Sequence, residues 1–147
     1  INDGSAALGF TVFSICMFAM RLMGDRISFK FGPSKTARYS GLVALIGSII
    51  LLTFESFFPL LIGFGLIGLG IAVIIPLAFS RAGNDKNISQ GVAIASIATL
   101  GYGGMLIGPL FIGFIAQATS IKTSFLIFPI LAFLIFALSK HLSIKSV

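Results

Sequence analysis

The sequence predicts an all-α integral membrane protein with about five membrane-spanning helices. Of its 147 residues, 57% are hydrophobic and only 10% are charged, whereas soluble domains carry about 25% charged residues. The mean hydropathy is +1.12. The apolar runs are long and continuous, unlike the alternating segments of about ten residues that are typical of membrane barrel strands. The positive charge lies between these runs, a pattern that indicates membrane topology.

Five apolar runs are long enough for a helix to cross the hydrocarbon layer, which takes about 20 residues. Between them lie the Gly, Pro, Asn, Asp, Ser and Lys residues that break or cap helices. We therefore expect a single transmembrane helical module over residues 1–147, with spans at about residues 6–23, 39–57, 58–79, 92–116 and 124–138.

Nine of the ten Lys and Arg residues fall on one face of the membrane if the chain crosses five times. They are Arg21, Arg26, Lys30, Lys35 and Arg38 around the first connection, Arg81 and Lys86 in the third, and Lys140 and Lys145 in the tail. The opposite face has only Lys122. The positive-inside rule makes the richer face cytoplasmic. We expect the N-terminus outside, the C-terminus inside, and one more helix before Ile1 to bring both ends to the cytoplasm.

The basic stretch RLMGDRISFKFG, Arg21 to Gly32, contains more than topology requires. It resembles the cytoplasmic loop signature of the major facilitator superfamily, a Gly-Asp-Arg core followed by basic residues and a glycine. The family has this signature after its second helix and, more loosely, after its eighth. Arg21 stands where the family usually has glycine, and Ser28-Phe29 where it tends to have glycine and a base. These departures fit the looser copy.

A second stretch supports the resemblance. The glycine-rich run from Gly101 to Gly113 includes Gly104, Gly108 and Pro109, and is similar to the antiporter-type motif of the family's fifth helix and its counterpart in the eleventh. The order of the two motifs fits helices two to six or eight to twelve, and the polar tail favours eight to twelve. The resemblance thus implies the C-terminal half of a twelve-helix bacterial inner-membrane carrier of unassigned substrate, with the N-terminal half of the same protein missing.

Asp25 is the acid of the signature, at a membrane border where an unpaired carboxylate is costly. The resemblance implies that it joins the two halves on the cytoplasmic side and stabilises the outward-open state. Its motif partners would be Arg21, Gly24, Arg26, Lys30 and Gly32. The residues alone also allow a simple ion pair with Arg21, one helical turn earlier.

Glycines and prolines lie inside the expected spans. The run from Gly63 to Gly70 contains a literal GxGxxG, but the dinucleotide fingerprint needs a strand before it and an acid about 20 residues on. Here it lies within an apolar span, and Asp85 falls in the next loop. These glycines instead predict a smooth surface for close helix packing. Pro76 and Pro109 each remove a backbone hydrogen bond, so we expect them to bend their helices.

Polar side chains within spans should face the bundle or a water-filled cavity. The candidates for a substrate cavity are Thr11, Ser14, Ser96, Thr99 and Tyr102. Hydrogen bonds to the same helix or a neighbour are the simpler interpretation of each hydroxyl. No Asp or Glu lies in the middle of a span, so a proton-coupling carboxylate is expected elsewhere in the protein.

Several function classes are disfavoured. The sequence has no His/Cys/acid cluster for a metal and no nucleophile–base pair, so we expect no enzyme, no metal and no cofactor. The basic residues do not form a stripe that would bind nucleic acid. We expect a secondary active transporter that moves a small solute across the lipid bilayer by alternating access. A truncated, non-transporting scaffold or gene remnant is the alternative, and a channel is third because no ring of ion ligands is visible.

Overall fold

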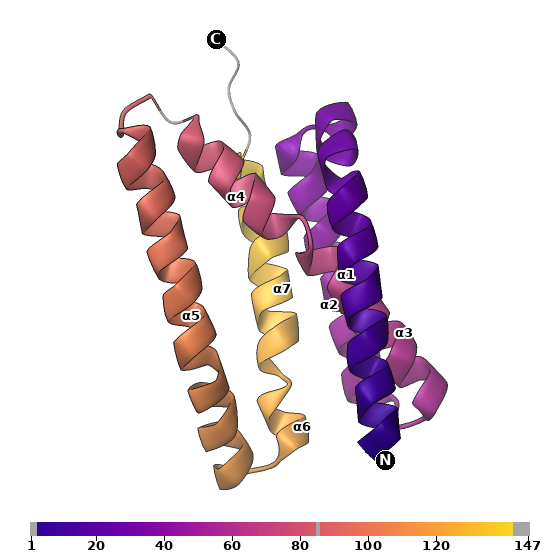
Figure 1. Ribbon diagram of the computed structural model, residues 1–147. Coiled ribbons are helices and arrows are strands. Elements are labelled where there is room, and N and C mark those ends of the chain that lie inside the picture. The colour runs from indigo at the N-terminus through magenta and orange to yellow at the C-terminus, as the bar shows by residue number, and fades with distance from the viewer. Residues whose placement is uncertain (1–2, 85, 143–147) are drawn as a thin grey trace. The chain divides into compact units, whose positions relative to one another are not determined.

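The computed structural model describes residues 3–84 and 86–142, so Asp85 and Lys145 lie outside the described residues. The described chain is helical and contains no strand (Figure 1). Its helices are α1 Asp3–Phe31, α2 Pro33–Thr53, α3 Phe57–Ile71, α4 Ile74–Gly83, α5 Gln90–Ala118, α6 Ile121–Ser124 and α7 Ile127–Leu138, followed by the 3-10 helix η1 Ser139–Leu142.

The described residues contain five segments long and apolar enough to span a membrane, which confirms the predicted all-α membrane fold. They are Ala7–Phe31, Pro33–Thr53, Phe57–Gly83, Gln90–Ala118 and Ile121–His141. The third segment is made of α3 and α4, and the fifth of α6, α7 and the start of η1.

The first connection is much shorter than expected. α1 continues past residue 23 to Phe31, and α2 already begins at Pro33, so Gly32 alone joins them. The Gly-Asp-Arg signature is therefore helical and not a loop. Charged and aromatic residues end an apolar run, but they do not end a helix, because most of them have adequate helix propensity.

Four of the five prolines lie in the first turn of a helix, where the missing N–H has no intrahelical partner to lose. Pro33 is the first residue of α2, and Pro59, Pro76 and Pro129 are each the third residue of theirs. Pro109 is inside α5, which continues through it. The breaks at Ala72–Val73 and Phe125–Leu126 fall three to four residues before Pro76 and Pro129. A proline ring clashes with the carbonyl four residues earlier, which accounts for both positions.

The chain forms two compact units, described here one at a time. The first comprises Ile1–Ile74 and Leu126–Val147, and its described helices are α1, α2, α3, α7 and η1. Within it, α3 packs against both α1 and α2, and α2 also packs against α7 and η1. The second unit, Ile75–Phe125, contains most of α4 together with α5 and α6, and α5 packs against α6.

Glycines on two opposite faces of α3 allow it to lie between α1 and α2. A Cβ on Gly63 would come within 3.0 Å of the Gly47 carbonyl oxygen of α2. A Cβ on Gly68 would overlap the Phe13 carbonyl oxygen of α1. Because these close neighbours are backbone atoms, side-chain rotation cannot make room. Small residues at such contacts let helix backbones approach closely, and this run therefore serves packing on both sides.

Candidate functional site

The signature segment occupies the last turns of α1, and Gly24 fixes it against the end of α3. Gly24 is buried, and a Cβ there would come 2.5 Å from Cγ1 of Val73. Val73 lies in the break that follows α3. The glycine that precedes the acid is thus explained by close packing within the first unit.

Asp25, next to Gly24, lies on an exposed part of α1. Arg21 is also exposed, and among the described residues Asp25 has no ion pair with Arg21 or with any other base. The simple i, i+4 pair is therefore not formed. The described residues of the first unit therefore leave this carboxylate without an ion pair.

Gly32 makes the turn between α1 and α2 with φ 84° and ψ 153°. This region of backbone space is accessible almost only to glycine. The turn is satisfied by hydrogen bonds from Gly32 N–H to the Ser28 carbonyl, 2.8 Å, and from Thr36 N–H to the Gly32 carbonyl, 3.0 Å. The final glycine of the signature is therefore required by backbone geometry.

The start of α2 is tied to the end of α7. The Ser34 hydroxyl donates a 2.8 Å hydrogen bond to the Ser139 carbonyl, and the Arg38 guanidinium lies 5.0 Å from the centroid of the Phe136 ring. These contacts place the Gly32 turn and η1, with its exposed Lys140, at the same end of the first unit. No sequence pattern predicts this connection.

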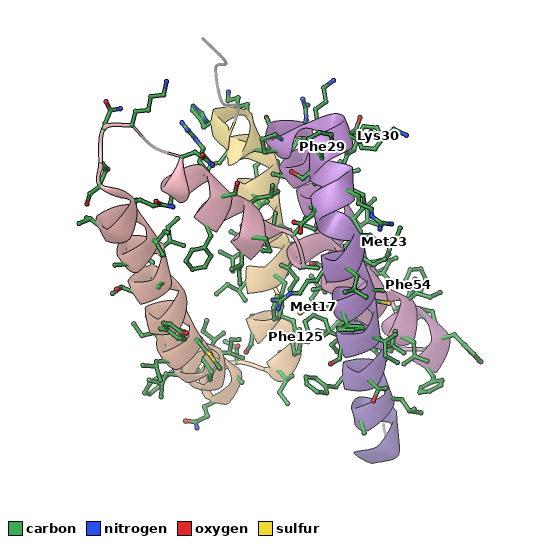
Figure 2. All side chains as sticks on the ribbon, turned by 45° about the horizontal axis from the view of Figure 1, so that its top comes forward. Met17, Met23, Phe29, Lys30, Phe54 and Phe125 are labelled. Atoms are coloured by element: carbon green, nitrogen blue, oxygen red, sulfur yellow. The ribbon has the colours of Figure 1, made fainter. Side chains whose placement is uncertain are left out.

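Lys30 also lies at this end, beside the exposed Phe29, as Figure 2 shows. Its Nζ is 5.6 Å from the centroid of the Phe31 ring. Arg26 is exposed one turn earlier. Basic side chains therefore gather around the one-residue turn.

The hydroxyls proposed to line a substrate cavity mostly bond to their own helices. Each is 2.8 Å from a carbonyl four residues earlier: Thr11 from Ala7, Ser96 from Val92, and Thr99 from Ala95. Tyr102 is 71% exposed. Thr11 and Ser14 lie on α1 in the first unit, and the other three lie on α5 in the second. A hydroxyl that donates to its own helix can still accept a hydrogen bond, so the cavity stays a prediction.

The motif glycines of α5 have open surroundings. Among the described residues, no heavy atom lies within 4 Å of a Cβ added at Gly104, Gly108 or Gly113, once the helix's own nearby backbone is set aside. Packing among the described residues of the second unit therefore does not account for these three glycines, in contrast to the glycines of α3 within the first unit. The described residues also contain no group of three His, Cys, Asp or Glu side chains that could hold a metal ion.

Comparison with known proteins identifies the family. The model of the Major Facilitator Superfamily matches residues 1–143. An uncharacterised transporter, y4wD, of Sinorhizobium fredii is 39% identical over 94% of this chain and 37% of its own length. An uncharacterised MFS-type transporter of Yersinia pestis is 40% identical over 85% of this chain and 33% of its own. The membrane protein MosC of Rhizobium meliloti is 35% identical over 86% and 31%.

No solved structure is significantly similar to the chain. The chain spans about a third of the length of the curated relatives that it matches. The match to the family model over nearly all residues, together with the apolar helices, makes this chain an integral membrane protein that belongs to the major facilitator superfamily.

Proposed function

We propose that the chain is the C-terminal half of a secondary active transporter, and not of an enzyme, in a bacterial cytoplasmic membrane. The transporter would carry a small solute by alternating access, with two helical halves rocking about a site near the middle of the membrane. Family membership and relatives named as transporters support this proposal. The two motifs, in the order of helices eight to twelve, support the C-terminal placement.

The observation that carries the proposal is the position of Asp25. Its neighbour Gly24 is buried against Val73, while Asp25 itself is exposed and has no ion pair within the described chain. A carboxylate held on a rigid helix end near a membrane border is stabilised by an Arg or a helix N-terminus. We infer that such a partner lies on the other half of the transporter and meets Asp25 when the cytoplasmic side is closed.

The proposed contact would act because it is present in only one of the two conformations of the transporter. It forms in the outward-open state and breaks in the inward-open state, so it shifts the equilibrium by its own free energy. Each 1.4 kcal/mol corresponds to about a tenfold change in the ratio of the two states. Removing the charge of Asp25 while keeping its shape should therefore favour the inward-open state.

The topology of the first unit is consistent with a cytoplasmic location for Asp25. The Gly32 turn and η1 lie at the same end, and the basic residues gather there. Under the positive-inside rule this end faces the cytoplasm. The N-terminus of the chain would then be outside and the C-terminus inside.

The test is Asp25→Asn in the full-length protein, reconstituted in vesicles. Alkylation rates of single cysteines near either membrane face report the conformational equilibrium, and uptake from a panel of small solutes reports transport. Glu55→Gln, which follows the other end of α2, removes a carboxylate charge elsewhere and is the control. We expect Asp25→Asn alone to raise alkylation on the cytoplasmic side and to lower uptake. Unchanged alkylation and uptake would exclude the gate, and absence of uptake by the unmodified protein for every solute would favour a non-transporting scaffold.

A further inference from the structure

A pocket of about 450 Å³ lies within the first unit, between the end of α1 and the start of α2. Its walls include Met20, Ile27 and Phe31 of α1 and Tyr39 and Val43 of α2, and Leu69 of α3 lines its inner side. The larger lining side chains are thus mainly apolar. The family motifs do not account for this space.

The pocket follows from how the helices pack. α1 and α2 are consecutive in sequence, but each packs mainly on α3 and they contact each other much less. Gly32 joins them at one end without filling the space between them. A mainly apolar cavity offers water few hydrogen-bond partners and binds apolar groups instead. In a membrane, the most abundant apolar group is the acyl chain of a lipid.

Positive charge lies at the end of the pocket nearest the turn. Phe31 lines the pocket, and the Lys30 ammonium lies 5.6 Å from the centroid of its ring. Lys35 is exposed and precedes the lining residue Tyr39 by one helical turn, which puts both on the same side of α2. Each of these two lysines is therefore next to, or one helical turn from, a lining residue near the Gly32 turn.

Among the described residues of α1 and α2, no carboxylate lies on the pocket side to offset these charges. Asp25 precedes Ile27 by two residues, so it lies on the other side of α1 from the pocket. No further Asp or Glu occurs before Glu55, which follows the far end of α2. The mouth of the pocket is therefore complementary to an anion.

We propose that this pocket binds an anionic phospholipid, with one acyl chain between α1 and α2 and the phosphate held by Lys30 and Lys35. The apolar walls alone would give little preference among lipids, because all lipid tails are about as apolar as the side chains that they contact. The selectivity comes from the lysines. Each basic residue near an anionic membrane surface contributes about 1 kcal/mol, which is a factor of about five in affinity.

The bound lipid would add to the packing between two helices that contact each other directly much less than each contacts α3. It would also occupy the end of α1 that carries Asp25. The proposal does not depend on transport activity, since a non-transporting module with the same fold would have the same pocket.

The experiment uses the delipidated full-length protein and native mass spectrometry. The protein is titrated with phosphatidylglycerol and phosphatidylcholine that have the same acyl chains. We expect a preference for phosphatidylglycerol that falls about fivefold in Lys30→Gln or Lys35→Gln and about thirtyfold in the double variant. Lys86→Gln, an exposed lysine of the second unit, is the control and should keep the preference.

A second pair of variants tests the acyl chain. Val43→Phe puts an aromatic ring into the pocket in place of a smaller aliphatic side chain. Leu42→Phe makes the same kind of change at the adjacent residue, which is 39% exposed and does not line the pocket. We expect Val43→Phe, and not Leu42→Phe, to reduce the number of tightly bound long-chain lipids. The unfolding midpoint without added lipid shows whether each variant is folded.

Three results would overturn the proposal. One is an equal affinity for the two lipids. Another is a preference for phosphatidylglycerol that survives the double lysine variant. The third is competition by free inorganic phosphate at the concentration of the lipid phosphate, because the site would then bind an ion without its acyl chain.

Discussion

The close contact between α2 and α3 makes Gly70→Ala the most informative perturbation of the fold. The added Cβ would lie 2.6 Å from both the Cβ and the backbone nitrogen of Ala44, and 2.7 Å from the Ser40 carbonyl oxygen. Non-bonded carbon atoms prefer about 3.5–4.0 Å, so α2 would have to retreat by about 1 Å. Two of the three atoms belong to the backbone, and no rotamer change can relieve the overlap.

α2 has little freedom to move away, because its other side is also closely packed. A Cβ at Gly41 would come 2.8 Å from the Phe136 backbone nitrogen of α7. Overpacking costs about 1–3 kcal/mol, and contacts on both sides of α2 place this case near the upper end. Replacing glycine by alanine inside a helix returns up to about 1 kcal/mol. We expect Gly70→Ala to lower the free energy of unfolding by about 2 kcal/mol.

The assay is equilibrium unfolding in mixed micelles with increasing sodium dodecyl sulfate, followed by far-ultraviolet circular dichroism. Gly91→Ala is the matched control, since no heavy atom lies within 4 Å of the Cβ that it adds. That control should leave stability unchanged or raise it by up to about 1 kcal/mol. If Gly70→Ala proves as stable as the parent protein or more stable, the packing described for α3 is wrong.

Of three further predictions, two are tested by unfolding and one by labelling in membranes. Gly32→Ala forces a side chain into a conformation that glycine alone adopts easily, and should destabilise the protein by about 1–3 kcal/mol in the same unfolding assay. Ser34→Ala removes the hydrogen bond to the Ser139 carbonyl and should cost about 1 kcal/mol; an unchanged midpoint would mean that this bond does not hold α2 to η1. In a Cys16→Ala background, cysteines introduced at Lys30 and Lys122 should react with impermeant reagents from opposite sides of the membrane, and labelling from one side would exclude the five-span topology.

The number of membrane-spanning segments could be predicted from the sequence because the hydrocarbon layer determines both the length and the apolar composition of each segment. The ends of the spans could not. The expected loop after residue 23 is helical to Phe31. A hydropathy pattern shows which residues can lie in the hydrocarbon layer, but it does not show where the backbone hydrogen bonds of a helix end. Only Gly32, with its positive φ, ends the helix. The resemblance to the family motif identified the residues of the signature, but it did not predict that they are helical.

The glycines of α3 show how spacing holds more information than composition. Gly63 and Gly70, seven residues apart, meet α2, while Gly65 and Gly68, three apart, meet α1. Residues at these intervals lie on the same face of a helix. If the segment is taken to be helical, the sequence alone therefore predicts two glycine faces. We predicted a single smooth surface. Which neighbours these faces meet cannot be derived from periodicity, and neither can the bond between Ser34 and Ser139, which are 105 residues apart.

The signature of α1 separates into residues that the chain explains and one that it does not. Gly24 is required by contact with Val73, and Gly32 by its backbone angles. Asp25 is exposed and has no ion pair among the described residues. An exposed residue without such a contact contributes little to stability, so its replacement by asparagine should leave unfolding unchanged within about 0.5 kcal/mol. Replacing Gly24 or Gly32 by alanine should reduce stability, whereas Asp25→Asn should change only the conformational equilibrium and transport. If Asp25→Asn instead destabilises the protein as strongly as Gly32→Ala, the acid has a structural role inside this half, and the inferred contact with a second half loses its main support.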